Sequence, residues 1–348
     1  MIVIHARNVQ SALPEALHRL RLQGVERDTR NGPVRMFPTP VTTVYEQPCE
    51  RVLFWPQRDA NPFFHLYESL WMLAGRNDVE SVANFVQNMR NFSDDGKTFH
   101  GAYGHRWRVH FNIDQLHAIM LILKNNKNDR RCVLQMWDAR TDLAREGKDF
   151  PCNLSAVFQV NHNGQLDMTV YNRSNDIIWG AYGANAVHFS YLQEYVARFV
   201  GVPVGRYYQV SANFHAYKDK LEQVEQLADQ AAQPYEPVAD PYAIGAVEPF
   251  PLMQIPVNEW ENDLLMFLSR GPVLGLRDPF FRKVASPMVQ AHQLFKQRQR
   301  GAERFQAALE MTNKIAATDW KLACRQWLER RQKQYQRAQD DGPGHQEN

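Results

Sequence analysis

The feature that most constrains the fold is an 18-residue stretch, 154–171 (LSAVFQVNHNGQLDMTVY). It holds two runs rich in apolar, β-branched and aromatic residues on either side of His162-Asn163-Gly164. Because Asn-Gly suits a tight turn between strands, this pattern predicts a β-hairpin. Further strands are predicted at 130–137 and 206–217.

Two strongly apolar segments predict buried helices. The segment 61–75 (NPFFHLYESLWMLAG) opens with Asn-Pro, closes with Gly and carries a single carboxylate, Glu68. The segment 184–200 is similarly apolar. The remaining predictions are an amphipathic helix at 10–23, a Gly/Pro/Arg-rich turn at 27–35, a long irregular connection at 228–260, helices at 262–270 and 285–337, and a disordered polar tail at 338–348.

Composition excludes several classes of protein. The net charge of +2 is far from the strong basic excess of proteins that bind nucleic acid mainly through charge. A small anionic ligand needs only a few arginines, so this class stays open. No run approaches the ~18 apolar residues of a membrane span, and the N-terminus lacks the apolar stretch of a signal peptide. Four scattered cysteines and twelve histidines, without a CxxC, HxxxH or HExxH pair, predict a reduced, cytoplasmic protein without a bound metal.

A set of motifs follows in a fixed order. Arg130-Arg131 is followed by Pro151-Cys152, then by the run 172–176 (NRSND), by 180–185 (GAYGAN) and finally by 215–217 (HAY). Upstream, Arg30-Asn31-Gly32 lies in the predicted turn, and 102–108 (AYGHRWR) follows the Glu68 helix.

This order resembles the thymidylate synthase superfamily, whose signature is PCH, QRSxD, a Gly-containing turn with Asn, and DxHxY. The resemblance covers roughly residues 27–222. It implies an α/β (α+β) fold, a thymidylate synthase-like twisted sheet flanked by helices, assembled as a homodimer. We expect residues 1–260 to form the catalytic domain, 261–337 a C-terminal helical extension, and 338–348 the tail.

The resemblance implies a covalent mechanism on a pyrimidine nucleoside monophosphate. Cys152 would add to C6 of the base, which makes C5 nucleophilic toward 5,10-methylenetetrahydrofolate, the one-carbon co-substrate. Arg173 is expected to favour the thiolate. Glu68 would move protons through water, and Tyr103 would help to remove the C5 proton. The alternatives are a small buried thiol, a surface glutamate and a core aromatic.

Binding residues follow from the same resemblance. Arg30, Arg173 and Ser174 are candidates for the phosphate, and Arg130 and Arg131 for the phosphate of the partner subunit. A solvated surface is the alternative for these arginines. Asn185 would read a uracil edge through its amide, or serve as a helix cap. The sugar hydroxyl would be bound by His215 and Tyr217, which share a strand face, and the pterin by Asp176, which a turn would also explain.

Departures from the family bear on the product. Asn153 stands in place of the usual histidine, Asn213 in place of the usual aspartate, and the apolar C-terminal tail that closes over folate is missing. Because hydride transfer favours a site closed to water, we favour hydroxymethylation of dUMP. The alternatives are a thymidylate synthase that makes dTMP, a dCMP or CMP hydroxymethylase, and a non-catalytic nucleotide- or RNA-binding relative, prompted by the basic C-terminal helices. A lid formed by those helices is a further hypothesis.

Overall fold

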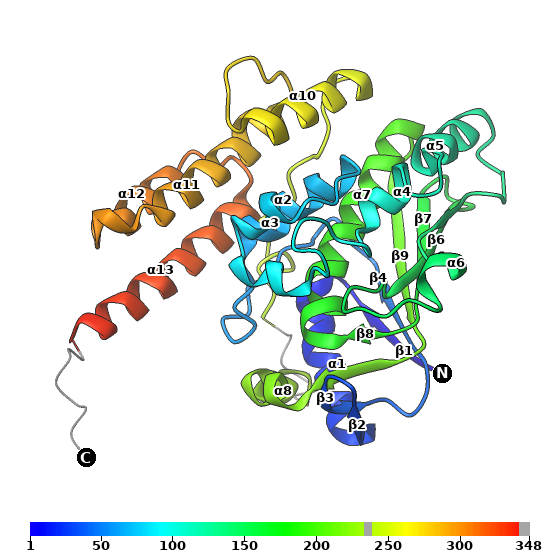
Figure 1. Ribbon diagram of the computed structural model, residues 1–348, viewed down its shortest axis with the longest axis horizontal. Coiled ribbons are helices and arrows are strands. Elements are labelled where there is room, and N and C mark those ends of the chain that lie inside the picture. Colours follow the sequence, from blue (N-terminus) through cyan, green and yellow to red (C-terminus); the bar gives the residue numbers. More distant parts are fainter. Residues whose placement is uncertain (233–238, 341–348) are drawn as a thin grey trace.

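The computed structural model describes residues 1–232 and 239–340. Its centre is a six-stranded mixed sheet with the strand order β1-β4-β9-β7-β6-β5 (Figure 1). The predicted hairpin is confirmed, with a loop of residues 161–165 between its strands. The strands are β1 (Ile2–Ala6), β4 (Val41–Tyr45), β5 (Val133–Gln135), β6 (Asn153–Val160), β7 (Leu166–Asn172) and β9 (Val204–Ser211).

A second, four-stranded sheet corrects two predictions. Its order is β2-β3-β10-β8, with β2 at Val25–Thr29, β3 at Gly32–Met36, β8 at Asn175–Asp176 and β10 at Phe214–Tyr217. The segment 27–35, predicted as a turn, is mostly a hairpin that reverses at residues 30–31, where Gly32 has a φ of +117°. The single strand predicted at 206–217 breaks after Ser211, and its two halves belong to different sheets.

Helices cover one face of the six-stranded sheet. The predicted helices at 10–23, 61–75 and 184–200 are confirmed as α1 (Val9–Gln23), α2 (Pro62–Leu73) and α7 (Asn185–Val200). Asn8 and Asn61 cap the first two through their side chains. The other short elements here are α3 (Val79–Ala83), η1 (Gln87–Phe92), α4 (Tyr103–Arg108), α5 (Gln115–Asn125), α6 (Ala139–Asp142), α8 (Lys218–Val224) and η3 (Glu225–Leu227).

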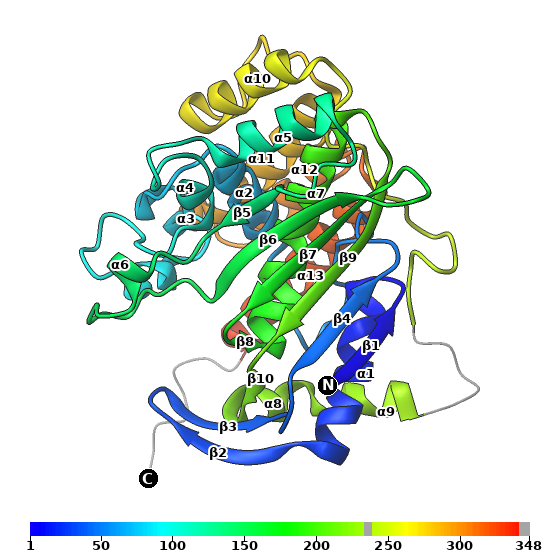
Figure 2. The same ribbon diagram turned by 90° about the vertical axis from the view of Figure 1, so that its right-hand side faces the viewer.

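The other face of this sheet is open, and Figure 2 shows its strands in front of the helices. Val133, Val157, Thr169 and Tyr208 are register partners across β5, β6, β7 and β9, and they form one row of partly or fully exposed side chains. In the next row Tyr171 is 42% exposed. Sheets with a bare face of this composition commonly pack against a second sheet.

The polypeptide enters α7 through a kinked π-helical segment, η2 (Ile177–Ala184). Tyr182 and Gly183 have non-helical backbone angles there. A Cβ atom on Gly183 would lie 2.6 Å from an Arg58 guanidinium nitrogen and 2.9 Å from the carbonyl oxygen of Ile178, so a larger residue would force the backbone to shift. Arg58 is itself buried, and it donates to the carbonyl oxygen of Ile178 (2.6 Å). The kink fixes the direction in which Asn185, the first residue of α7, leaves the segment.

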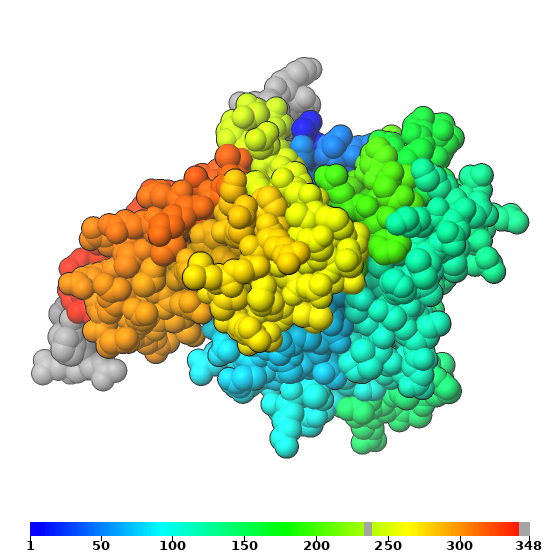
Figure 3. Space-filling view, turned by 90° about the horizontal axis from the view of Figure 1, so that it is seen from above, coloured from blue at the N-terminus to red at the C-terminus, as the bar shows by residue number. Residues whose placement is uncertain are grey.

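The C-terminal helices form one side of the molecule (Figures 1 and 3). They pack on α2 and on the segment after α3 through aromatic rings: Trp327 meets Phe63 edge-on, and His292 stacks on Phe85, which stacks on Tyr67. The predicted helical character is confirmed, with interruptions. The elements are α10 (Val257–Arg270), η4 (Phe281–Ala285), α11 (Ser286–Lys296), η5 (Arg298–Arg300), α12 (Glu303–Thr312) and α13 (Thr318–Asp340).

Two predicted irregular segments are partly helical. The connection at 228–260 holds α9 (Ala228–Ala232) and the first residues of α10, and 233–238 lie outside the described residues. The tail predicted from 338 begins with three residues of α13, and 341–348 lie outside the described residues. Within the described ranges, no helix combines the length and the apolar character that crossing a membrane requires.

Candidate active site

Cys152 lies half-buried in the loop that leads into β6. Its backbone N–H and that of Asn153 both donate to the Tyr103 hydroxyl, at 3.0 and 3.3 Å. Its carbonyl oxygen accepts from the backbone N–H of Arg173, at 2.9 Å. Tyr103 on α4 and Arg173 after β7 therefore hold the nucleophile candidate from two sides. Burial, followed by the nearby Cys152, raises the pKa of Tyr103.

Arg173 acts on the Cys152 thiol in the predicted direction, but burial has the larger effect on the thiol pKa. Arg173 does approach the thiol, with Nη2 3.8 Å from Sγ, and its Nε donates to the carbonyl oxygen of Pro151 at 2.9 Å. Burial nevertheless raises the pKa of Cys152 and outweighs the lowering effect of Arg173, while Asp149 and Asp176 add to the rise. The thiol form is therefore favoured in this structure, because the arginine alone does not offset the lost hydration.

Glu68 faces a histidine that sequence reasoning missed. The Oε2 atom of Glu68 lies 3.0 Å from Nε2 of His188, and both atoms lack a hydrogen-bond partner. His188 is buried on α7, three residues after Asn185, so it shares a helix face with that amide. All three residues, together with Tyr103, line a cavity of about 190 Å³. The spacing from Asn185 was the available signal, but only the packing of α2 on α7 brings His188 to Glu68.

The amide of Asn185 belongs to a chain of buried polar side chains. Its Nδ2 donates to Oδ1 of Asn175 (3.1 Å), whose own Nδ2 donates to Ser211 Oγ (3.1 Å). Asn153 Nδ2 donates to Oδ1 of Asn185 at 3.4 Å, while Oδ1 of Asn153 has no partner. The residue that departs from the family beside the nucleophile thus touches the predicted base-reading amide.

A larger cavity of about 760 Å³ adjoins the first, and Phe92 lines both. Asp176 places its Oδ1 where it accepts the backbone N–H groups of Ile178 (2.9 Å) and Trp179 (2.5 Å). Its Oδ2 is buried without a partner, and burial raises the pKa of this carboxyl group. A free carboxylate oxygen beside the Trp179 ring matches the N–H edge and flat surface of a pterin, so these residues fit a folate. The remaining lining includes Arg30, Lys148, Tyr217 and Lys220.

The phosphate candidates meet at the loop of Cys152. The guanidinium of Arg30 lies 5.9 Å from the ring centre of Phe150, whose carbonyl oxygen accepts from Arg173 at 3.5 Å. Ser174 lies directly after Arg173 and is partly buried. The structure thus brings Arg30 and Arg173 to one loop from opposite ends of the sequence.

His215 and Tyr217 lie side by side on β10, with ring centres 5.3 Å apart. Nδ1 of His215 is bonded to Oδ1 of Asn213 (2.9 Å), so the residue in place of the usual aspartate still orients the ring. Burial lowers the pKa of His215, against the opposing effect of Asp176. Tyr217 lines the larger cavity, whereas His215 lines neither.

Arg130 and Arg131 are not brought to this site. Both are exposed before the edge strand β5, and Arg131 pairs with Asp129 at 2.8 Å. Neither lines either cavity. Their role toward a partner subunit stays a prediction. The C-terminal helices also contribute no residue to either cavity, since the last lining residue is Lys220, so the lid hypothesis gains no support.

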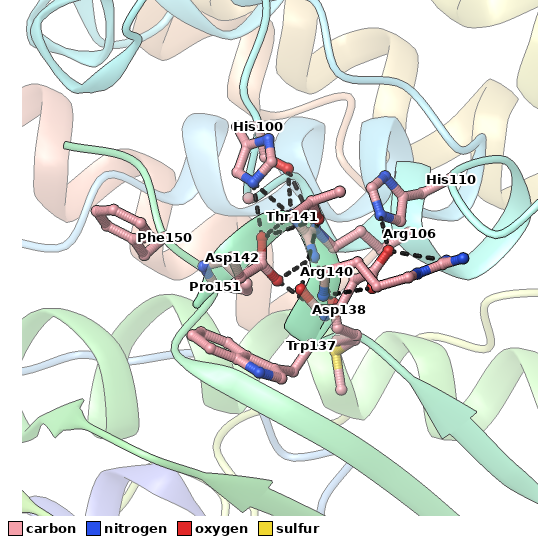
Figure 4. A network of polar contacts seen from close by, with 12 residues as sticks. His100, Arg106, His110, Trp137, Asp138, Arg140, Thr141, Asp142, Phe150 and Pro151 are labelled. Carbon is pink, nitrogen blue, oxygen red and sulfur yellow. Dashed lines mark hydrogen bonds and ion pairs between the residues drawn. The ribbon is translucent and has the colours of Figure 1, made fainter. Parts of the chain in front are cut away.

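Figure 4 draws a dense polar network together with Phe150 and Pro151, the two residues that precede Cys152. Asp142 accepts two hydrogen bonds from the fully buried Arg106, at 2.6 and 2.8 Å, and lies 2.7 Å from His100 Nε2. Its neighbour Asp138 binds His110 and Arg140. Burial alone would raise the pKa of Asp142, but the bonds from Arg106, Asp138 and His100 lower it. Every charge in this network has a partner.

Among the described residues, no group of three or more His, Cys, Asp or Glu side chains is arranged to hold a metal ion.

Comparison with known proteins gives the family. Residues 55–240 match the family model described as thymidylate synthase. The chain is 63% identical to a deoxyuridylate hydroxymethyltransferase of Pseudomonas phage M6, over 98% of this chain and 99% of the relative. It is 40% identical to a deoxyuridylate hydroxymethyltransferase of Bacillus phage SP01, over 52% of this chain and 50% of the relative. A thymidylate synthase of Corynebacterium aurimucosum is 32% identical over 48% of this chain and 65% of the relative.

Cys152 itself lines neither cavity, but Lys148 and Phe150 in the loop before it line one each. The fold, these two cavities and the matches define a one-carbon transferase. The chain belongs to the thymidylate synthase family.

Proposed function

We propose that this enzyme is a deoxyuridylate hydroxymethyltransferase, which converts dUMP, water and 5,10-methylenetetrahydrofolate into 5-hydroxymethyl-dUMP and tetrahydrofolate. The observation that carries the proposal is the 63% identity to the phage M6 relative of that name along nearly the whole chain. The unpartnered pair of Glu68 and His188 at a cavity beside the nucleophile loop supports it independently.

Cys152 opens the reaction. Its thiolate adds to C6 of the uracil ring, and the ring electrons move toward C5 and O4. Arg173 lies near enough to the sulfur to offset part of the cost of a buried negative charge. The Tyr103 hydroxyl, held by the backbone of Cys152 and Asn153, is the candidate for removing the C5 proton.

The folate co-substrate supplies a one-carbon unit at the oxidation level of formaldehyde. Asp176 and Trp179 are the candidates for holding its pterin, because an unpartnered carboxylate oxygen and an exposed aromatic ring meet there. Arg30, Arg173 and Ser174 would hold the phosphate of dUMP, and Asn185 would read its uracil edge. His215 and Tyr217 remain the candidates for the sugar hydroxyl.

The last step separates hydroxymethylation from methylation. Once C5 has bonded the new carbon and the bond from that carbon to the folate nitrogen has broken, the base carries an exocyclic methylene. The oxygen of a water molecule forms a bond to this carbon, and Glu68 accepts a proton from the water. The enolate then re-forms the C5–C6 double bond and expels the Cys152 thiolate. His188 is the positioning residue that holds Glu68 and the water.

Two properties of the assembly complete the proposal. A homodimer that pairs two six-stranded sheets would cover the row of Val133, Val157, Thr169 and Tyr208. All four cysteines are free thiols, which favours a cytoplasmic location.

The test is mass spectrometry of the products from methylenetetrahydrofolate with dUMP, dCMP, UMP or CMP. We expect hydroxymethyl-dUMP and tetrahydrofolate from dUMP alone. A methyl product with dihydrofolate would identify a thymidylate synthase, and a hydroxymethylated cytosine nucleotide would move the substrate to dCMP or CMP. Failure of all four to react, without release of tritium from C5-labelled dUMP, would favour a nucleotide-binding protein without catalysis.

A further inference from the structure

A cavity of about 380 Å³ lies among the C-terminal helices, apart from the two cavities around Cys152. It is bounded by α11, η5, α12 and α13, with Phe85 on the side of the catalytic region. Its volume falls within the range of about 300–1,000 Å³ that small-molecule sites occupy. A neighbouring cavity of about 350 Å³ shares Phe85, His292 and Lys296 with it, which extends the available space.

The charge of this cavity has one sign. Lys296, Arg298 and Arg304 line it, and its lining contains no carboxylate. None of the three forms an ion pair within the described residues. Burial and the nearby Lys296 lower the pKa of His292 to about 3, so its ring adds no charge at neutral pH. Between Lys296 and Arg337 the sequence has eleven lysines and arginines against four acidic residues, a net charge of +7 in a chain of net charge +2.

The walls of this cavity are aromatic, and two polar donors in them have no partner. Phe295 contacts the ring of Trp327 at 5.1 Å, and the guanidinium of Arg304 lies over the rings of Phe295 and Tyr335 at 5.4 and 5.3 Å. Nε of Arg304 and Nε1 of Trp327 are buried without a hydrogen-bond partner, and Trp327 is only 5% exposed. Unpartnered buried donors cost free energy until an acceptor reaches them.

We propose that this cavity is the binding site of a nucleoside triphosphate, distinct from the active site. Three cations without counter-ions offset most of the negative charge of a triphosphate. An arginine stacked on aromatic rings keeps its planar N–H groups available for phosphate oxygens. Phe295 and Tyr335 are half-buried, so their rings offer a surface on which a base can stack. The three cations come from three different elements, α11, η5 and α12, and line one cavity, which favours a small ligand over a nucleic-acid strand.

Equilibrium dialysis of the full-length protein tests this site. The probes are labelled ATP and the four deoxynucleoside triphosphates, in the presence of saturating dUMP to occupy the active site. We expect saturable binding of at least one triphosphate, with one molecule per chain, and competition by inorganic triphosphate. Arg298→Gln and Lys296→Gln, which remove exposed and unpaired charges, should each weaken this binding about tenfold. Arg304→Gln should do the same if it folds.

Two matched variants locate the binding. Arg325→Gln removes a charge from α13 outside the cavity, where the arginine pairs with Glu329, and it should leave binding unchanged. Lys220→Gln removes a cation from the larger cavity near Cys152 and should also leave it unchanged. The proposal is overturned by absence of saturable binding up to about 1 mM, by equal weakening in Arg325→Gln, or by loss in Lys220→Gln. It is likewise overturned if a single-stranded oligonucleotide binds and triphosphates do not displace it.

Discussion

Two carboxylates near α4, each with a buried oxygen, differ in how completely their oxygens are satisfied. Asp142 is bonded to Arg106, His100 and a backbone N–H, and both of its carboxylate oxygens have hydrogen-bond partners. Glu68 has only His188 at 3.0 Å, without a hydrogen bond, and it borders a cavity. An unsatisfied buried polar group costs free energy. Where such a group borders a cavity, we expect a ligand to supply the missing hydrogen bond. We therefore assign the Asp142 network to the scaffold and expect the Glu68 pair to take part in the chemistry.

Removing the nucleophile should produce the largest effect on the chemical side of this comparison. Cys152→Ala should lower turnover about 10⁴-fold or more, because no other group can add to C6. Binding of dUMP should stay within about tenfold, or ~1.4 kcal/mol, since phosphate and base contacts remain. Tritium release from C5-labelled dUMP measures the first effect and calorimetry the second. Cys49→Ala removes a thiol that lies beside Arg51 and Glu194 and takes no part in the proposed reaction, so it is the control. Turnover by Cys152→Ala at the wild-type rate would end the covalent mechanism.

On the scaffold side, Asp142→Ala should lower the free energy of unfolding by about 3–5 kcal/mol, because it leaves Arg106 charged and unpaired in the interior. Glu68→Ala should cost less than about 1 kcal/mol, since it breaks no hydrogen bond. Urea denaturation of the two variants measures the difference. Equal losses of stability would erase the distinction between scaffold and site.

The pH dependence of stability distinguishes Asp142 from a third carboxylate, the buried Asp319. Burial raises the pKa of Asp319, at the start of α13, to about 6, above the ~3.9 of an unfolded aspartate. Its contribution to stability is therefore complete below about pH 4 and is lost as the pH rises to about 6, a change of about 2–3 kcal/mol. The pKa of Asp142 is lowered, so its contribution is lost in the opposite direction, toward acid. Denaturation of Asp319→Asn across this range should lack the decline, and a decline as steep as in the wild type would refute the assignment.

The smallest effect expected is at His188. His188→Ala should lower kcat about tenfold, or ~1.4 kcal/mol of transition-state stabilisation, because Glu68 and its water lose their orientation. The KM for dUMP should hardly change, and His188→Gln should restore part of kcat. Steady-state kinetics with product analysis measures both. A rise in KM at constant kcat would mean that His188 shapes the binding site alone.

Sequence patterns predicted most of the individual helices and strands, but they did not predict features that depend on contacts between distant segments. Glu68 and Asn185 lie on helices predicted from apolar runs, and Cys152 precedes the predicted hairpin. His188 was missed because its meaning requires α2 against α7, two segments more than 100 residues apart. The thiol of Cys152 was expected to be activated by Arg173, but the balance depends on burial, which no motif records. Likewise, the split after Ser211 follows from pairing with two different sheets.

The stack of Tyr67, Phe85 and His292 connects α2 to α11, one of the C-terminal helices. Tyr67 precedes Glu68 in the chain, so one helix presents a carboxylate to the cavity of about 190 Å³ and an aromatic ring to the C-terminal helices. If a ligand on one side of this helix shifts it, binding on the two sides is linked, and the linkage is reciprocal: the factor by which one ligand changes the affinity of the other is the same in both directions. A nucleotide held by α11 and α13 would then change the affinity for dUMP by the same factor as dUMP changes the affinity for that nucleotide, because both ligands act on α2.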